Sequence, residues 1–467
     1  MPLKFFNTAQ RRVEDFVPLV DGQVSMYCCG PTVYNYAHIG NLRTYLFEDF
    51  LRRALEYLGF QVLHVMNVTD VGHLSDDGDE GEDKMLKGAR ERGMSVWEIA
   101  QFFSDAFFKD SERLAILRPK VVCPATQHID SMIALIHRLE EKGLTYLAGG
   151  NVYFDTSKFP EYGKMALLDR QEVSAVSRVS HDRNKKNSRD FVLWFTKSKF
   201  ESQAMLWDSP WGRGYPGWHI ECSAMSMQYL GEKFDIHCGG IDHISVHQTN
   251  EIAQSEGAIG HPWVHYWLHG EFLLLSKEKM SKSTGDFLTL QSLVDQGYDP
   301  LDYRWFCLGA HYRSPLTFSA EGLDGARNAR NNLNEKVLGW KKIAEPQKLG
   351  QGGLEYRARW VAALENDLAL PQALSVVWAV VKDASLGTGE KLTLLYEMDK
   401  VLGMGWQALT GDKSESVPAE ILTLVEERQA ARQIKDWARS DAVREKLKQL
   451  GWTVEDSPAG PLPKRIV

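Results

Sequence analysis

The pattern that most constrains the fold of this 467-residue chain is an apolar segment, a loop, an amphipathic helix and a second apolar segment in succession. Residues 23–28 form the first expected strand, which Gly30 and Pro31 end. Large apolar residues recur at three- and four-residue spacing over 41–57, which predicts a helix, and 60–68 form the second strand. This order predicts an α/β protein with a Rossmann-type nucleotide-binding unit and ligands at the carboxyl ends of its strands.

Two short motifs far apart in the sequence predict one nucleotide site. They are His38-Ile39-Gly40-Asn41 and Lys279-Met280-Ser281-Lys282-Ser283. The first lies at the expected helix start, where unpaired N–H groups stabilise phosphate and a glycine permits close approach. The second follows an expected strand at 271–275, and its two lysines can neutralise charge that grows in a transition state. Either motif alone could be a helix cap or a solvated loop, but the pair predicts ATP activation.

Composition sets the class of protein. Hydrophobic residues make up 43% and charged residues 25%, which predicts a globular chain of about two to four domains. No apolar run approaches the roughly 20 residues of a membrane helix, and the first residues lack secretory-signal features, so we expect a cytoplasmic enzyme with no membrane partner. Because the net charge is -8, a polyanionic partner must bind a local basic surface.

Six scattered cysteines are too few for a disulfide framework, so we expect metal binding or catalysis from some of them. Cys29 follows the first expected strand, and Cys222 lies in a separate segment. His247 and Glu251 are four residues apart, which puts both on one face of a helix. Two thiolates, an imidazole and a carboxylate can satisfy a tetrahedral zinc ion. The spacing is not that of a zinc finger, so buried structural cysteines are the alternative.

Further patterns outline the rest of the chain. Strands are expected at 151–154, 191–195 and 234–237, helices at 326–345, 355–365, 372–383 and 390–407, and linkers at 346–353 and 411–418. The acidic segment 75–83 lacks the twelve-residue ligand spacing of a calcium loop, so we interpret it as a solvated surface loop.

The two motifs resemble those of the class I aminoacyl-tRNA synthetases, His-Ile-Gly-His and Lys-Met-Ser-Lys-Ser. The second motif is intact, whereas Asn41 replaces a histidine and can donate a hydrogen bond but carries no charge. Three longer phrases, at 27–34, 217–225 and 234–240, resemble the cysteinyl-tRNA synthetases, and the resemblance covers nearly the whole chain.

This resemblance implies one zinc ion per chain, bound by Cys29, Cys222, His247 and Glu251. The family often has His-His-Glu-Asn-Glu at the last site, where this chain has His-Gln-Thr-Asn-Glu, so both implied ligands are present. Cys238, His237 and His243 are alternative ligands, and Cys28 is expected to pack on the other side of its strand. Residues matching the family's amino-acid pocket are Cys29, Gly30, Thr32, Thr69 and Trp218.

The implied activity is that of a cysteine-tRNA ligase. The carboxylate of L-cysteine attacks the α-phosphorus of ATP, pyrophosphate leaves, and the terminal ribose of tRNA(Cys) attacks the adenylate carbonyl. Zinc would take the cysteine thiol as thiolate and reject serine, so we expect no editing activity. Magnesium accompanies ATP. His38, Asn41, Lys279 and Lys282 are the implied transition-state contacts, and Gly40, Met280, Ser281 and Ser283 complete the implied ATP site.

The resemblance also implies a division into domains and a nucleic-acid partner. Residues 1–117 and 206–317 correspond to the catalytic Rossmann-type domain, 118–205 to a connective insertion that contacts the tRNA acceptor end, 318–409 to a helical bundle and 410–467 to a small anticodon-binding domain. Basic residues thread this last segment beside Trp437, which suits RNA: Arg428, Arg432, Lys435, Arg439, Arg444, Lys446 and Lys448. By resemblance, the chain is expected to be a monomer.

Two alternative functions share part of this interpretation. A ligase that joins cysteine to a small amine, as in the mycothiol pathway, needs no anticodon-binding domain, so residues 410–467 argue against it. A catalytically silent tRNA-binding paralogue has no need for Lys279, Lys282 and a complete ligand set, all of which are present.

Overall fold

The computed structural model describes residues 2–72, 89–90, 92–168, 182–197, 205–275, 288–410, 419–433, 436–457 and 460–465. It divides into two compact units, Met1–Gln407 and Ala408–Val467, each of which is described by itself. The acidic segment 75–83, the motif at 279–283 and the expected linker at 411–418 lie outside the described residues.

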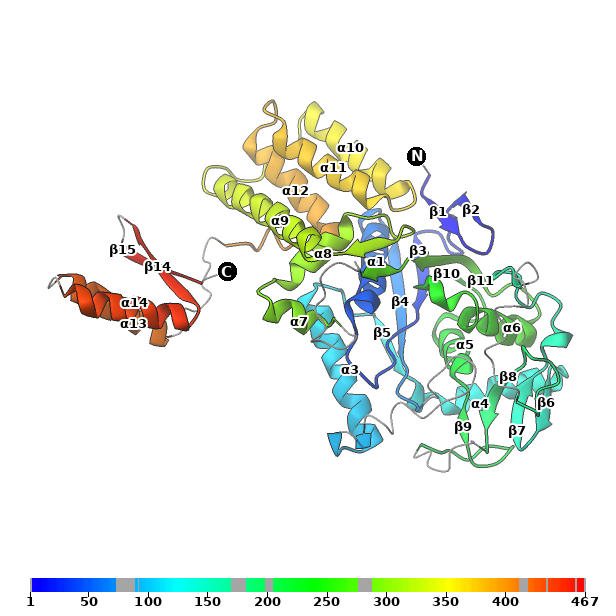
Figure 1. Cartoon of the computed structure of the whole chain (residues 1–467). Helices are drawn as coiled ribbons and strands as arrows, with labels where there is room; N and C mark the ends of the chain where they lie inside the picture. Colours follow the sequence, from blue (N-terminus) through cyan, green and yellow to red (C-terminus); the bar gives the residue numbers. More distant parts are fainter. Residues whose placement is uncertain are drawn as a thin grey trace. The chain divides into compact units, whose positions relative to one another are not determined.

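The first unit is built around a five-stranded parallel sheet with the strand order β11-β10-β3-β4-β5 (Figure 1). Its strands are β3 (Gln23–Cys28), β4 (Gln61–Val68), β5 (Val121–Pro124), β10 (Phe234–Gly240) and β11 (Val264–Gly270). Helix α1 (Ile39–Tyr57) joins β3 to β4, which confirms the predicted βαβ unit. Sequence order changes direction between β3 and β10, and at such a switch point the loops after the two strands separate and leave a crevice.

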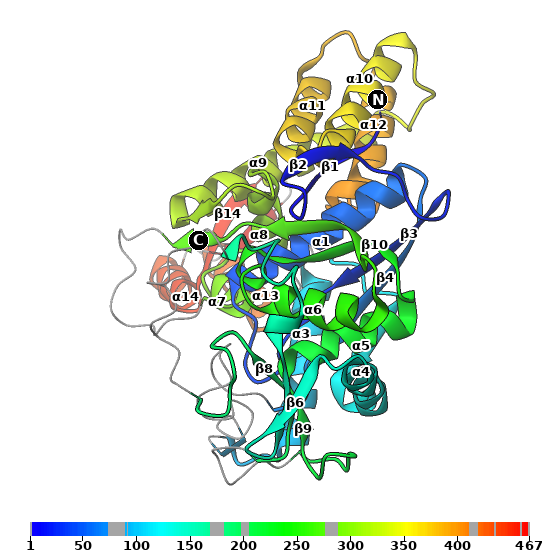
Figure 2. The ribbon, with the colours of Figure 1, turned by 90° about the vertical axis from the view of Figure 1, so that its right-hand side faces the viewer.

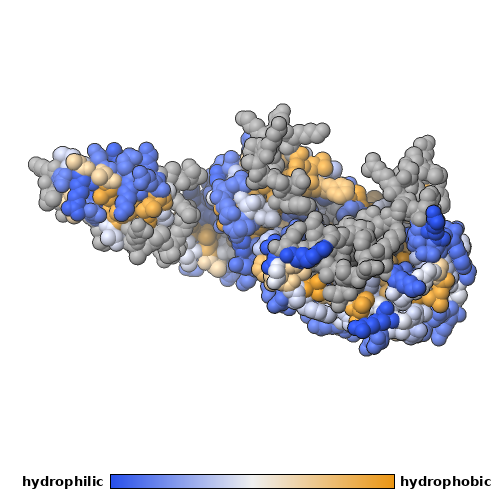
Figure 3. Space-filling view, turned by 60° about the horizontal axis from the view of Figure 1, so that its bottom comes forward, coloured by the Kyte–Doolittle hydropathy of each residue, from blue (hydrophilic) through white to orange (hydrophobic). Residues whose placement is uncertain are grey.

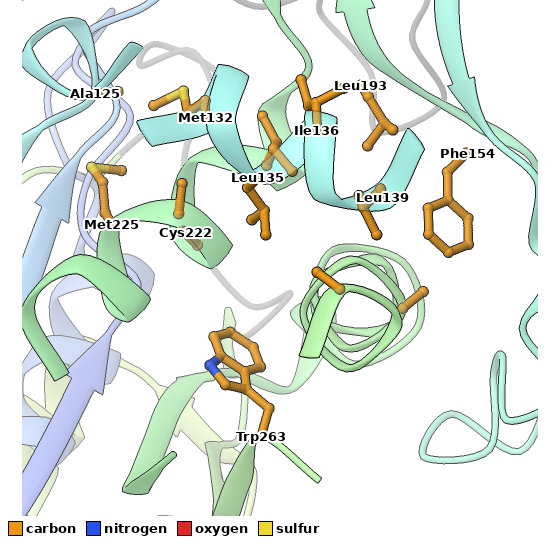
Figure 4. Packing of buried hydrophobic residues seen from close by; sticks show 14 of the residues in the cluster. Ala125, Met132, Leu135, Ile136, Leu139, Phe154, Leu193, Cys222, Met225 and Trp263 are labelled. Atoms are coloured by element: carbon orange, nitrogen blue, oxygen red, sulfur yellow. The ribbon is translucent and has the colours of Figure 1, made fainter. Parts of the chain in front are cut away.

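Helices cover both faces of this sheet because successive side chains of a strand point to opposite sides. Tyr27 of β3 points into a core built with α4 (Ile129–Glu141), α5 (Trp218–Leu230) and α6 (His247–Ile259). Cys28, the next residue, is buried beside Glu48 of α1, as expected for a packing residue. In Figure 4, α4 contributes Met132, Leu135, Ile136 and Leu139 to the core, where they lie with Cys222, Met225 and Trp263.

A second, antiparallel sheet has the order β6-β7-β8-β9 and lies between β5 and β10 in the sequence. Its strands are β6 (Thr145–Ala148), β7 (Asn151–Phe154), β8 (Phe191–Phe195) and β9 (Tyr215–Pro216). The strands predicted at 151–154 and 191–195 are therefore confirmed. Tyr153, Val192, Phe195 and Tyr215 form a small core of their own on this sheet.

Four helices follow β13 (Leu316–Phe318): α9 (Ala320–Lys341), α10 (Gln351–Glu365), α11 (Leu370–Lys382) and α12 (Thr388–Leu402). Helix α9 begins six residues before the predicted start because the Ser319 hydroxyl accepts from the Gly322 N–H at 3.1 Å. Helix α12 ends at Leu402, not 407, because Gly403 adopts a left-handed conformation with φ 69°. The predicted linker 346–353 is wrong in its last residues, which form the first turn of α10.

The remaining elements of this unit lie outside the five-stranded and four-stranded sheets. They are β1 (Lys4–Asn7), β2 (Arg12–Asp15), α3 (Val96–Arg113), β12 (Leu273–Leu275), α7 (Leu290–Asp295) and α8 (Pro300–Leu308), with 3-10 turns at Ala125–Gln127, Thr156–Lys158 and Ile241–His243. The β1–β2 hairpin lies beside the helical region, where the Phe6 N–H donates to Asp367 Oδ1 at 2.9 Å (Figure 2). On the face shown in Figure 3, hydrophobic residues form small separate patches among hydrophilic ones.

The second unit contains α13 (Ala419–Gln433), α14 (Trp437–Gln449) and a hairpin of β14 (Trp452–Ser457) and β15 (Gly460–Arg465). Its core includes Leu424, Leu447 and Trp452. Trp437 is 59% exposed, whereas Arg428 is buried and Arg439 pairs with Glu427 at 2.8 Å. The basic residues thus do not form one uniform exposed surface. No helix in the described parts of either unit is both long enough and apolar enough to cross a bilayer.

Candidate active site and metal centre

A pocket of about 300 Å³ opens at the switch point between β3 and β10. The loop after β3, the start of α1, the end of β10, and helices α5 and α6 all contribute to its wall. Nine of the residues predicted for the site line it: Cys29, Gly30, Thr32, His38, Asn41, Thr69, Trp218, Cys222 and His247. The fold therefore brings the predicted amino-acid residues and the first nucleotide motif into one cavity.

The four predicted zinc ligands form a buried cluster, and three of them, Cys29, Cys222 and His247, line this pocket, whereas Glu251 does not. Cys29 follows β3, Cys222 lies on α5, and His247 and Glu251 lie one turn apart at the start of α6. Their candidate ligand atoms all lie within 4.8 Å of one another. Tetrahedral zinc with these donors would hold them roughly 3.3 to 3.8 Å apart, so the cluster fits the ion after a small contraction.

The alternative ligands have other contacts. His237 Nε2 lies 2.8 Å from Glu251 Oε2, so His237 helps to fix the orientation of the Glu251 carboxylate. Cys238 is buried opposite Cys28 on the neighbouring strand, and His243 lines the pocket. Within the described ranges, no second group of three or more His, Cys, Asp or Glu residues could hold a metal.

Electrostatics within the cluster shift the pKa values of the four ligands in opposite directions. The hydrogen bond with Cys222 raises the pKa of Cys29, and the Glu251 carboxylate, against the effect of burial, raises the pKa of His247. The hydrogen bond with Cys29 lowers the pKa of Cys222 to about 7, despite burial. Burial alone would raise the pKa of Glu251, but the imidazoles of His237 and His247 together hold it well below its usual range. His247 Nε2 lies 3.0 Å from Glu251 Oε1. Metals bind thiolate, neutral imidazole and carboxylate, so Cys222 and Glu251 favour the ligating form, whereas binding of a cation would release a proton from Cys29 and from His247.

A chain of hydrogen bonds supports the floor of the pocket. The Gly30 N–H donates to Asn67 Oδ1 at 2.7 Å, and Asn67 Nδ2 donates to Thr69 Oγ1 at 3.1 Å. The Thr69 hydroxyl donates to Glu221 Oε2 at 2.9 Å, and Glu221 is fully buried. Thr32 pairs with Thr69 along the backbone, which fixes the loop after β3 against β4.

Asn67 and Glu221 were missed by the sequence analysis. Asn67 could have been predicted from the sequence, because it is a polar residue at the carboxyl end of an apolar strand, where parallel sheets bind their ligands. Glu221 lies beside Cys222 on α5, one of the helices that line the pocket. On the same helix, the ring of Trp218 lies 4.5 Å from that of His247, measured between centroids.

The first nucleotide motif forms the N-terminal cap of α1. His38 Nδ1 accepts from the Asn41 N–H at 3.1 Å, and Asn41 Oδ1 accepts from the His38 N–H at 3.3 Å. The substitution of histidine by asparagine is therefore compatible with an ordered helix start, and the amide nitrogen of Asn41 is the donor that can meet a ligand. Burial lowers the pKa of His38, so its imidazole is neutral at pH 7.

The second nucleotide motif lies outside the described residues, but both of its flanks meet the start of α1. Leu273, before the motif, lies 3.9 Å from where a Cβ on Gly40 would stand. After the motif, the Ile39 N–H donates to the Leu288 carbonyl at 2.8 Å. Arg43 of α1 donates to the carbonyls of residues 271 and 272. These contacts direct the chain on either side of 276–287 to the helix start that carries the first motif.

Comparisons with known proteins agree with this geometry. A family model described as tRNA synthetases class I (C) catalytic domain matches residues 15–328, and a model described as cysteinyl-tRNA ligase anticodon binding domain matches residues 414–460. The chain is 51% identical over 486 residues to the cysteine–tRNA ligase of Treponema denticola, covering 98% of both chains. It is 49% identical over 464 residues to cysteine–tRNA ligase 1 of Burkholderia lata, covering 98% of this chain and 96% of the relative.

Among solved structures, the fold is similar to that of Mycobacterium tuberculosis methionyl-tRNA synthetase in complex with methionyl-adenylate. The TM-score is 0.56 at 15% identity, covering 84% of this chain and 92% of that one. At this identity the likeness shows the fold alone: a central parallel sheet with helices on both faces and a helical region after it.

Proposed function

Because this chain belongs to the cysteine–tRNA ligases, a family of class I tRNA synthetases, its activity is the ATP-dependent joining of cysteine to tRNA, and we propose that zinc selects the cysteine. The observation that carries this proposal is the buried cluster of Cys29, Cys222, His247 and Glu251, of which the first three line the pocket. When bound there, zinc would take the substrate thiol as thiolate, a ligand that the hydroxyl of serine matches poorly.

The residues around the cluster would hold the rest of the amino acid. Gly30 leaves room beside Asn67, and the Asn67–Thr69–Glu221 chain fixes the loop that carries Cys29 and Gly30. Trp218 closes the side next to His247. This arrangement supports a small amino acid held with its carboxylate toward His38, because His38 and the cluster share the pocket.

ATP would lie at the start of α1. The helix N-terminus favours phosphate, and neutral His38 and Asn41 can donate hydrogen bonds to it. Lys279 and Lys282 would neutralise charge on the phosphates as pyrophosphate leaves, and Gly40, Met280, Ser281 and Ser283 would complete the site, with magnesium accompanying ATP. The anchoring of residues 273 and 288 at α1 supports this assignment.

Transfer of cysteine then requires tRNA. The terminal ribose hydroxyl attacks the carbonyl of the adenylate, and AMP leaves. The match of residues 414–460 to an anticodon-binding domain supports tRNA(Cys) as the acceptor and weighs against a small amine.

Two assays separate the possible outcomes. Cysteine-dependent ATP–pyrophosphate exchange measures activation, and transfer of labelled cysteine to unfractionated tRNA measures charging. We expect both activities. Exchange without charging would favour the small-amine ligase, whereas the absence of both would favour a silent tRNA-binding protein.

The metal assignment is tested by substituting one ligand. Cys222→Ser should lose most of its zinc, measured by elemental analysis, and its discrimination between cysteine and serine in the exchange assay should weaken. Cys307→Ser is the matched control, because Cys307 is also buried but lies on α8, outside the pocket. Full zinc content in Cys222→Ser at one ion per chain would refute the ligand set.

A further inference from the structure

An exposed group of aromatic side chains lies at the mouth of the pocket, and the activation chemistry does not use it. Tyr36, in the loop between β3 and α1, is 41% exposed, and Phe102, on α3, is 39% exposed. Both rings contact Phe103, which is buried (2% exposed), at centroid distances of 5.1 Å. We call Tyr36, Phe102, Phe103 and Arg92 the aromatic platform. Two of its members, Tyr36 and Phe103, line the pocket together with His38 and Cys222.

The rings of the aromatic platform pack edge to face, and an arginine lies beside them. Tyr36 and Phe102 meet edge to face at 6.0 Å and 71°, and Phe102 and Phe103 meet at 5.1 Å and 83°. The guanidinium carbon of Arg92 lies 6.0, 5.9 and 5.1 Å from the three ring centroids. Tyr36 and Phe102 are thus two adjacent exposed rings beside the pocket, and covering their apolar surface with a ligand would gain free energy.

Aromatic rings next to an arginine are the chemistry that recognises unpaired nucleotides. The ring faces stack on bases, and the guanidinium neutralises the adjoining phosphate or stacks on a base itself. Double-stranded RNA buries its base faces within the helix, so such a surface fits a single strand. The location of the aromatic platform indicates which single strand it binds. The 3′ ribose of tRNA must enter the pocket, so the nucleotides before it must cross the pocket mouth.

We propose that the aromatic platform stacks an unpaired base of the tRNA 3′ end and thereby positions the terminal ribose in the pocket. This inference rests on the proposed function, because it takes the acceptor to be tRNA. The base of ATP is the competing occupant. The platform favours tRNA because Phe102 is exposed but is not among the residues that line the pocket, so a strand that crosses the mouth can reach it.

The test compares Phe102→Ala with two matched variants. Phe102→Tyr keeps the ring and should behave as the wild-type protein. Trp97→Ala removes an aromatic residue of the same helix that is 51% exposed but whose ring contact is with Trp207, and it should also leave tRNA binding unchanged. Both side chains are exposed, so folding should be preserved in all three variants, which thermal unfolding checks.

Binding is measured with intact tRNA and with tRNA from which the unpaired 3′ nucleotides have been removed. Phe102→Ala should weaken binding of intact tRNA by roughly tenfold, in line with the loss of one stacked base. Binding of the shortened tRNA should match the wild-type value, and cysteine-dependent pyrophosphate exchange should keep its KM for ATP.

The remaining outcomes refute either the stacking of the tRNA 3′ end on the aromatic platform or the proposed function. Unchanged binding of intact tRNA, or equal weakening with shortened tRNA, refutes stacking of the 3′ end while the proposed function stands. A raised KM for ATP in the exchange assay assigns the platform to ATP instead. Absence of exchange and charging in the wild-type protein refutes the proposed function itself.

Discussion

Replacing Gly30 by alanine should disable cysteine activation, because the added methyl group has nowhere to go. A Cβ at this position would stand 1.6 Å from the Asn67 carbonyl oxygen and 2.9 Å from Met66 Cγ, whereas ordinary contacts begin at 3.4 Å. The nearest obstacle is backbone of β4, so no side-chain rotation relieves the clash. The loop that carries Cys29 must therefore move away from β4 by more than an ångström.

A displacement of this size has a predictable cost. A shift of about 1 Å at a positioning residue can reduce the rate about 100-fold, and overpacking of a core costs about 1–3 kcal/mol of stability. We expect kcat/KM for cysteine in the exchange assay of Gly30→Ala to fall by about 100-fold or more. The folded protein should still form, because the stability loss is small for a unit of this size.

The control is Gly339→Ala. A Cβ on Gly339, a helical residue of α9, meets nothing within 4 Å, so alanine there should raise stability by up to about 1 kcal/mol and leave activity unchanged. If Gly30→Ala keeps kcat/KM for cysteine within about threefold of the wild-type value, the steric argument for the pocket floor is wrong.

Three further predictions concern other parts of the first unit. Arg304→Met should lower the free energy of unfolding by about 3–5 kcal/mol in urea titrations, because it breaks the fully buried contact between Arg304 and Asp49 at 2.6 Å; a loss below about 1 kcal/mol would contradict this. Burial lowers the pKa of His64 to about 3, so below pH 6.5 the unfolded state binds a proton that the folded state excludes, and stability falls as the pH decreases. His64→Leu should therefore flatten the decline of unfolding free energy between pH 6.5 and 4.5 by up to about 1.4 kcal/mol per pH unit, and identical slopes would exclude this role. Lys282→Ala should reduce the pyrophosphate exchange rate about 100-fold with little change in the KM for cysteine, and a rate near the wild-type value would remove Lys282 from the ATP site.

Local patterns in the sequence were sufficient for the elements that carry the site. The spacing of apolar residues predicted β3, α1 and β4, because strand and helix periods depend on neighbours only a few residues away. The pairing of His247 with Glu251 followed from helical spacing in the same way. Helix ends were less accurate, since they depend on single events such as the Ser319 cap and the left-handed turn at Gly403.

By itself the sequence determined which residue types were present and, through resemblance, the chemistry they serve. Apart from the zinc ligands and the two nucleotide motifs, which the sequence had already grouped, only the tertiary structure decided which distant residues meet. The pairing of β10 with β3 brings α5 and α6 to Cys29 and creates the Asn67–Thr69–Glu221 chain, whereas the contact of α3 with the loop after β3 creates the aromatic platform. Strand order is set by packing over the whole sheet, and no spacing along the chain encodes it. The metal cluster therefore depends on the strand order at the switch point as well as on its four residues.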